Sequence, residues 1–182
     1  MGIMGSVDGN RFDPRGNYTI EQAIVTVVRT AFLMGYSPEG WVVSSEQIIF
    51  ELVNEERRKA GVQPLEWAEP LARTARLHAE ERARHNDTEH IGADGSSPSD
   101  RARRQGWTLG GVGENGAGPG SRMRTDGGWY IYPGAPARVI VLWLGSPVHR
   151  DNMLDPAFKY AGIGAARPVG DAYQGRIFLK LG

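Results

Sequence analysis

Apolar residues follow a helical spacing in the first part of this sequence and a strand spacing at its end. Ile48, Ile49, Leu52 and Val53 recur at the three- and four-residue intervals of one helix face. Within the predicted strand at 173–181, by contrast, Ile177, Leu179 and Leu181 alternate with Arg176, Phe178 and Lys180, as in a β-strand. Helices that come first, with strands interspersed later, predict an α+β domain or a three-layer α-β-α sandwich, because each apolar face needs a covering layer.

Turn and capping residues divide the chain further. Serine-proline pairs at Ser97 and Ser146 are expected to begin helices, with serine as the N-cap and proline at the first helical position. The predicted helices run over residues 19–33, from Ser44 or Ser45 to Gly61, and over 70–85, 97–106 and 135–144, and the predicted strands cover 127–132, 161–166 and 173–181.

Composition excludes several classes of chemistry and of partner. The chain of 182 residues has no cysteine, which removes disulfides, thiolate metal ligands and cysteine nucleophiles. Lysine plus arginine equals aspartate plus glutamate, at 21 each, so the charge balance indicates neither a nucleic-acid nor an anionic-membrane partner. The run Arg101-Ala-Arg103-Arg104 is expected to be a solvated helix face. No stretch approaches the roughly 20 apolar residues of a membrane span, and residues 1–5 lack the features of a signal peptide.

His149 is one of only four histidines and is expected in the first turn of a helix that begins after Ser146. The helix dipole disfavours positive charge at that end, so the imidazole is predicted to stay neutral. A neutral, positioned imidazole can bind a metal or exchange a proton. The alternative is that His149 lies at the start of a helix without a functional role.

His90 and Glu114 are the other candidate site residues. His90 follows a predicted helix, and Glu114 is flanked by glycines that allow a close approach of the backbone. Together with His149 they are too far apart for a local motif and can meet only through the fold. His78 is expected to be a hydrogen-bonded core histidine, and His85 to favour the negative pole at the end of its helix.

The order of these motifs over residues 45–182 resembles a bacterial CAP domain, from the superfamily of cysteine-rich secretory proteins, antigen 5 and pathogenesis-related 1 proteins. The matching segments are, in order, Leu52–Gly61 with Pro64–Trp67, Leu71–Ala79, His90–Arg101, Gly113–Asn115, Trp143–Leu154 and Gly162–Gly164. The resemblance implies an α-β-α sandwich whose central cavity is lined by two histidines and two acidic residues. By motif, His90 and His149 would be the histidines and Glu114 one acid, whereas Ser146 stands where the second acid is expected.

Residues 1–37 resemble the second half of an S-layer homology motif, a short helical segment. The match lies in Gly9–Pro14, Tyr18–Ala23 and Arg29. Residues 38–44 are expected to link this segment to the CAP-like domain at 45–182. Such motifs usually hold cell-wall polymers, so the resemblance implies the C-terminal part of a longer extracellular or cell-wall-associated protein, with its signal peptide upstream.

Three functions are compatible with these resemblances. The first is a non-enzymatic secreted domain whose cavity, with His90, Glu114 and His149, binds a small or apolar ligand or a partner protein. The second is a metal-dependent hydrolase or peptidase, in which His90 and His149 hold zinc and Glu114 is the general base. The third is a cell-wall attachment module built on residues 1–37. The missing second acid favours the first, with zinc bound at modest affinity, and the sequence leaves the oligomeric state open.

Overall fold

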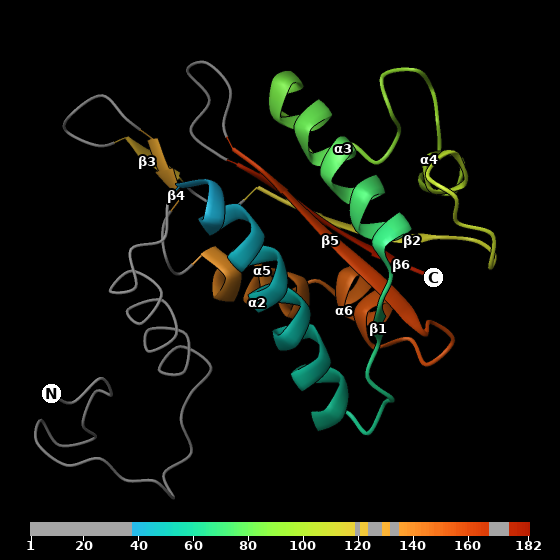
Figure 1. Cartoon of the computed structure of the whole chain (residues 1–182). Coiled ribbons are helices and arrows are strands. Elements are labelled where there is room, and N and C mark those ends of the chain that lie inside the picture. The colour runs from blue at the N-terminus through green and yellow to red at the C-terminus, as the bar shows by residue number, and fades with distance from the viewer. Residues whose placement is uncertain (1–37, 119–120, 124–128, 132–134, 168–174) are drawn as a thin grey trace, which may run out of the picture.

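The computed structural model describes residues 38–118, 121–123, 129–131, 135–167 and 175–182 (Figure 1). Along the chain, its elements are α2 (Pro38–Lys59), β1 (Glu66–Trp67), α3 (Glu69–His85), α4 (Pro98–Arg104), β2 (Gly113–Ala117), β3 (Ser121–Met123), β4 (Trp129–Ile131), α5 (Ala135–Gly145), α6 (Pro147–Leu154), β5 (Tyr160–Ala166) and β6 (Arg176–Leu181). None of the described helices combines the length and the apolar character that a membrane span requires.

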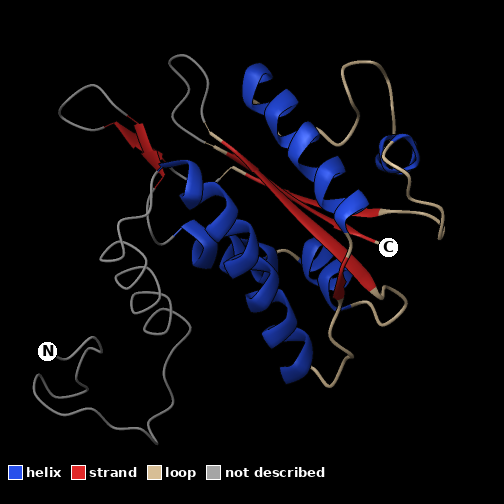
Figure 2. Cartoon of the chain, in the orientation of Figure 1, coloured by secondary structure: helices blue, strands red, loops and turns tan. Residues whose placement is uncertain are grey.

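A four-stranded sheet forms the middle layer, with the strand order β1-β5-β6-β2. Strand β6 is antiparallel to both β5 and β2, whereas the short β1 is parallel to β5. Helix α3 packs on β5 and β6 on one face, and α2, α5 and α6 cover the other (Figures 1 and 2). The predicted three-layer α-β-α sandwich is confirmed.

Two glycines of β5 set the distance between the sheet and α3. A Cβ atom placed on Gly162 would overlap the backbone of Leu71 and Ala72, and one on Gly164 would overlap the backbone of Ala75. Only a residue without a side chain therefore lets the helix backbone approach the strand this closely. The resulting contact fixes α3, and with it His78, against the sheet.

Strand β6 divides its side chains between the two helical layers. Leu179 joins the larger core between the sheet and α2, α5 and α6, which also holds Ile163 and Trp143. Phe178 points to the opposite face and packs against alanines of α3 and the ring of His78. The predicted alternation is confirmed, and every residue of β6 is buried because helices cover both faces.

Helix α2 and strand β2 differ from the expectation. Helix α2 begins at Pro38, so residues 38–44 are helical and do not form an extended linker. Proline fits the first turn of a helix, and Gly40 alone costs only about 1 kcal/mol there. Strand β2, around Glu114, was not expected, because its glycines are depleted in strands. The S-layer-like segment 1–37 lies outside the described residues.

Candidate functional site

Glu114 occupies the centre of the candidate site. It lies on β2, at the edge of the sheet, directly opposite Lys180 of β6. Directly paired residues of antiparallel strands point to the same face, so both side chains face the layer of α3 and α4. The side chain of Glu114 is 2% exposed and that of Lys180 is fully buried. Burial of both charges requires that they satisfy each other or find further partners.

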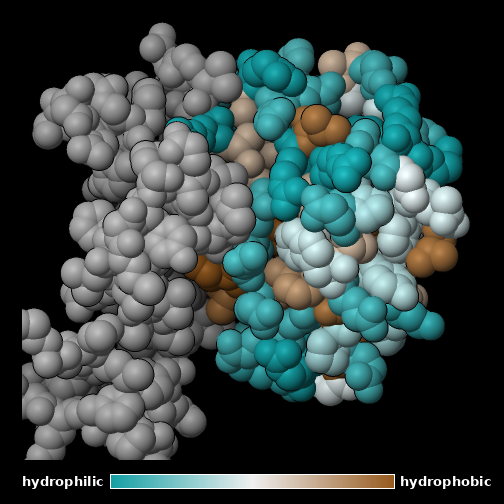
Figure 3. Space-filling model, in the orientation of Figure 1, coloured by the Kyte–Doolittle hydropathy of each residue, from teal (hydrophilic) through white to brown (hydrophobic). Residues whose placement is uncertain are grey.

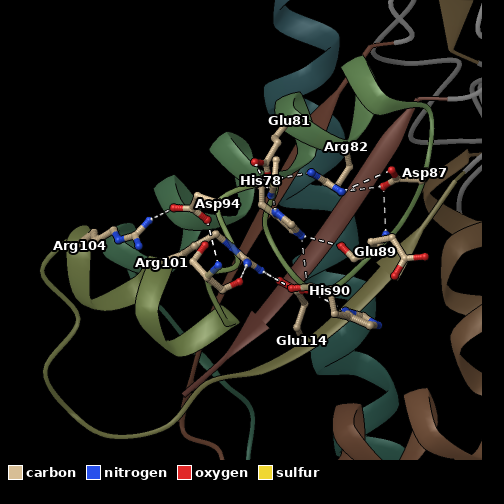
Figure 4. A network of polar contacts seen from close by, with 12 residues as sticks. His78, Glu81, Arg82, Asp87, Glu89, His90, Asp94, Arg101, Arg104 and Glu114 are labelled. Carbon is tan, nitrogen blue, oxygen red and sulfur yellow. Dashed lines mark hydrogen bonds and ion pairs between the residues drawn. The ribbon is translucent and has the colours of Figure 1, made fainter.

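Four basic side chains surround the Glu114 carboxylate. Figure 4 labels His78, His90 and Arg101 among them. Oxygen Oε2 contacts the ammonium of Lys180 and accepts a hydrogen bond from Nη2 of Arg101 at 3.1 Å. Oxygen Oε1 lies 2.7 Å from Nδ1 of His90 and 3.7 Å from Nε2 of His78. Since β6, α4, the α3–α4 loop and α3 each contribute one of these groups, Glu114 ties four separate segments together.

Arg101 anchors the loop that carries His90. Its guanidinium donates to the backbone oxygens of His90 at 2.9 Å and of Ser96 at 2.6 Å, in addition to Glu114. A capping box between Ser97 and Asp100 fixes the start of α4 one turn earlier. The expectation of a solvated face is therefore wrong for Arg101, whose side chain is 11% exposed, because this side of α4 packs toward β2.

His149 reaches the same edge of the sheet from α6. Ser146 is the N-cap residue and Pro147 follows it, as predicted, although the Ser146 side chain makes no capping hydrogen bond. The side chain of Asn115 donates to the backbone oxygen of His149 at 2.8 Å, and Asn152 donates to Asn115 at 3.1 Å. Consecutive strand residues point to opposite faces, so Glu114 holds His90 on one side of β2 and Asn115 holds His149 on the other.

The imidazoles of His90 and His149 both favour the neutral form. Burial and then the charge of Lys180 lower the pKa of His90. Burial and then the charge of His90 lower the pKa of His149. The predicted neutrality of His149 thus agrees in direction, with burial and His90 as its causes.

Three members of the cluster, Arg101, Lys180 and His78, have no counterpart among the predicted site residues. Lys180 lies in a strand with otherwise apolar neighbours, and burial, followed by the charge of Arg101, brings its pKa well below the usual range. A charged residue within a buried strand was the available signal. His78 is buried and bonded to Glu81 at 3.1 Å and to the backbone oxygen of Glu89 at 2.9 Å, which confirms the predicted core histidine. His85 ends α3 and is exposed.

His90 and His149 stay the candidate metal ligands. With Nδ1 of His90 directed at Glu114, its Nε2 is the nitrogen left for a metal, and a carboxylate behind a histidine is the usual orienting arrangement. No group of three or more histidine, aspartate or glutamate residues within the described part of the chain could hold a metal ion. Two imidazoles completed by water would bind zinc less tightly than the three protein ligands of catalytic zinc sites.

Two curated proteins of Bacillus subtilis (strain 168) are similar in sequence to this chain. The chain is 31% identical over 123 residues to the uncharacterized protein YkwD of Bacillus subtilis (strain 168), a match covering 68% of this chain and 43% of that protein. It is also 31% identical over 147 residues to the uncharacterized membrane protein YlbC of the same organism, covering 79% of this chain and 38% of the relative. The chain thus spans less than half the length of these curated relatives.

Solved structures share the fold. An extracellular protein containing an SCP domain from Bacillus anthracis str. Ames has a TM-score of 0.63 at 22% identity, covering 79% of this chain and 41% of that one. An outer surface protein from Borrelia burgdorferi has a TM-score of 0.57 at 20% identity, covering 76% of this chain and 92% of that one. The model of the "CAP: Cysteine-rich secretory protein family" matches residues 50–177, which include every residue of the Glu114 cluster except Lys180. This chain therefore belongs to the CAP, or cysteine-rich secretory protein, family.

Proposed function

We propose that this chain is a non-enzymatic binding domain of an extracellular protein, in which His90 and His149 hold a small, partly apolar ligand. The observation that carries the proposal is the environment of Glu114. Both of its oxygens already face basic groups of the protein, and its side chain is 2% exposed. Glu114 orients His90, while the side chain of His90 is 48% exposed and open to a ligand.

Apolar side chains next to both histidines support the apolar character of the ligand. Ile91, which follows His90, is 53% exposed, and Val148, which precedes His149, is 72% exposed. Exposed apolar residues mark a binding site when they form one surface with convergent polar groups, and the proposal therefore requires Ile91 and Val148 to line the same ligand as the two histidines. A ligand with a metal-binding or hydrogen-bonding head and a short apolar tail fits this combination.

The hydrolase alternative makes a different demand on Glu114. A general base must lie within hydrogen-bond reach of a water and have a free acceptor position for its proton. A carboxylate offers about four such positions; in this chain Lys180, Arg101 and His90 contact its oxygens, and with the side chain only 2% exposed, water has little access to a remaining position. We therefore expect no peptide hydrolysis above background. Turnover that is lost in the Glu114→Gln variant and in the presence of a chelator would establish the hydrolase instead.

A calorimetric titration with Zn²⁺ tests the histidine pair. Wild-type protein should bind one zinc with modest affinity, and His90→Ala or His149→Ala should abolish the binding because one imidazole remains. His85→Ala is the matched control, since His85 is an exposed histidine at the end of α3. Zinc binding that is unchanged in His149→Ala would exclude the proposed pair.

The apolar part of the proposal needs a second probe. Octanohydroxamate carries a metal-binding head and an alkyl tail that acetohydroxamate lacks, and it should bind the zinc-loaded protein more tightly than acetohydroxamate. Val148→Ser should remove that difference while leaving zinc binding intact, because Val148 offers no zinc ligand and is 72% exposed. Equal affinity of the two hydroxamates for wild-type protein would refute an apolar subsite.

A further inference from the structure

A pocket of about 230 Å³ opens between α3, α4 and the loop that joins them. Glu81 and Arg84 line it from one face of α3, Arg101 and Arg104 line it from α4, and Asp94 lines it from the loop. Figure 4 shows Asp94 between the two arginines of α4, and Figure 3 shows that the surface over α3 is largely hydrophilic. The pocket shares Arg101 with the Glu114 cluster, and its lining includes neither of the two site histidines.

The two acidic side chains of the pocket are already bonded within the protein. Asp94 accepts a hydrogen bond from Nη1 of Arg104 at 2.5 Å and another from the backbone N–H of Ser96 at 3.0 Å. Glu81 accepts from the backbone N–H of Ala93 at 3.0 Å and faces Nδ1 of His78 at 3.1 Å. Neither carboxylate is therefore free to neutralise a further cation.

The basic side chains, in contrast, retain unused donors. Arg84 forms no ion pair or side-chain hydrogen bond with any described residue. The buried Nε of Arg101 likewise has no hydrogen-bond partner among the described residues. Arg104 uses Nη1 alone for Asp94, although a guanidinium carries five N–H donors. The side-chain amide of Gln105 completes this donor-rich lining.

We propose that this pocket binds a small oxyanion, a carboxylate or phosphate group, between Arg84 and Arg104. Arg104 is paired with Asp94 and Arg101 with Glu114, whereas Arg84 has no carboxylate partner among the described residues, so the lining keeps an uncompensated positive charge and unused donors. The planar guanidinium fork matches the two oxygens of a carboxylate or a phosphate, and such charge-assisted bonds are among the stronger ones in proteins. A volume of about 230 Å³ admits a small anion, below the roughly 300 Å³ of the smallest sites for drug-sized ligands.

A titration of the full chain, followed by amide and arginine side-chain NMR signals, tests this site. Inorganic phosphate and succinate are the two probes, each added at constant ionic strength so that screening stays the same. Saturable shifts should appear at Arg84, Arg104 and Gln105 with at least one probe. Arg84→Gln should weaken binding about tenfold, because it removes one charge-assisted interaction.

Arg58→Gln is the matched control, since Arg58 is an exposed arginine of α2 outside the pocket. A larger effect of phosphate identifies a phosphate-bearing ligand, and a larger effect of succinate identifies a carboxylate. No saturable shift with either probe, or equal weakening by Arg58→Gln, overturns the proposal. Zinc binding should be the same in Arg84→Gln as in wild-type protein, so failure here is distinguishable from failure of the histidine pair.

Discussion

The buried pair of Glu114 and Lys180 allows a quantitative test of how the site is held together. Glu114→Gln keeps the size of the side chain and removes the charge that compensates Lys180 and Arg101. Removing one partner of a buried ion pair costs about 3–5 kcal/mol, because the other charge is left without compensation. We therefore expect the free energy of unfolding at pH 7 to fall by about 3–5 kcal/mol in this variant.

The Lys180→Met variant should be less harmful. Methionine fills most of the volume of the lysine stem, and Glu114 keeps Arg101 at 3.1 Å and His90 at 2.7 Å as partners. A loss of about 1–3 kcal/mol is expected for the lost contact between the Lys180 ammonium and the Glu114 carboxylate. In the double variant the loss should be smaller than the sum of the two single losses by about 2 kcal/mol, since no buried Lys180 charge is then left without Glu114, whereas Arg101 still loses its carboxylate partner.

Urea unfolding of the four proteins, followed by near-ultraviolet circular dichroism, measures these differences. Lys59→Gln provides the control, because Lys59 pairs with Glu55 on the surface at 49% exposure and should cost no more than about 0.5 kcal/mol. The reasoning fails if Lys180→Met destabilises the Glu114→Gln background as much as it destabilises the wild type.

Two further predictions concern α3. Gly164→Ala should lower the free energy of unfolding by more than about 3 kcal/mol, because its Cβ would overlap the helix backbone, whereas Gly111→Ala, with no atom within 4 Å, should have little effect on the melting temperature. Burial, followed by the charge of Lys180, lowers the pKa of His78 to about 4. As the pH falls, the unfolded chain takes up the proton of His78 before the folded chain does. The contribution of neutral His78 to the free energy of unfolding is therefore complete above about pH 6.5, and it is lost as the pH falls toward 4, by up to about 3 kcal/mol. Urea midpoints at pH 7 and 5 should differ more in wild-type protein than in His78→Gln, and equal differences would contradict the assignment.

Local signals in the sequence were sufficient for the scaffold. The serine-proline pairs at Ser97 and Ser146 predicted both helix starts, and the alternation in residues 176–181 predicted the strand β6. These features depend on neighbours within one turn or one strand. The start of α2 at Pro38 was missed because a proline followed closely by Gly40 is typical of a linker as well as of a first helical turn.

The charge network was beyond local signals. Arg101 and Lys180 are far apart in the sequence and meet only because α4 and β6 both lie next to β2. Periodicity places Arg101 on a short helix but does not say which side of that helix another layer covers. The Gly-Glu-Asn motif, by contrast, has a structural reason that becomes visible in the fold, since Glu114 and Asn115 point to opposite faces of an edge strand and hold one site histidine each.

Ser146 stands where the family resemblance implies a second acidic residue. Restoring an acid at this position tests whether its absence weakens metal binding by His90 and His149. Ser146 is the N-cap residue of α6, three positions before His149, and its side chain makes no capping hydrogen bond. Residues three apart on a helix are neighbours, so a carboxylate in Ser146→Glu should raise the pKa of His149 and can serve as a third metal ligand. Zinc affinity should rise by about tenfold in calorimetry, while Ser146→Gln, which lacks the charge, should leave it unchanged. A Ser146→Glu variant that binds zinc no better than wild type would show that this position does not face the His90 and His149 pair.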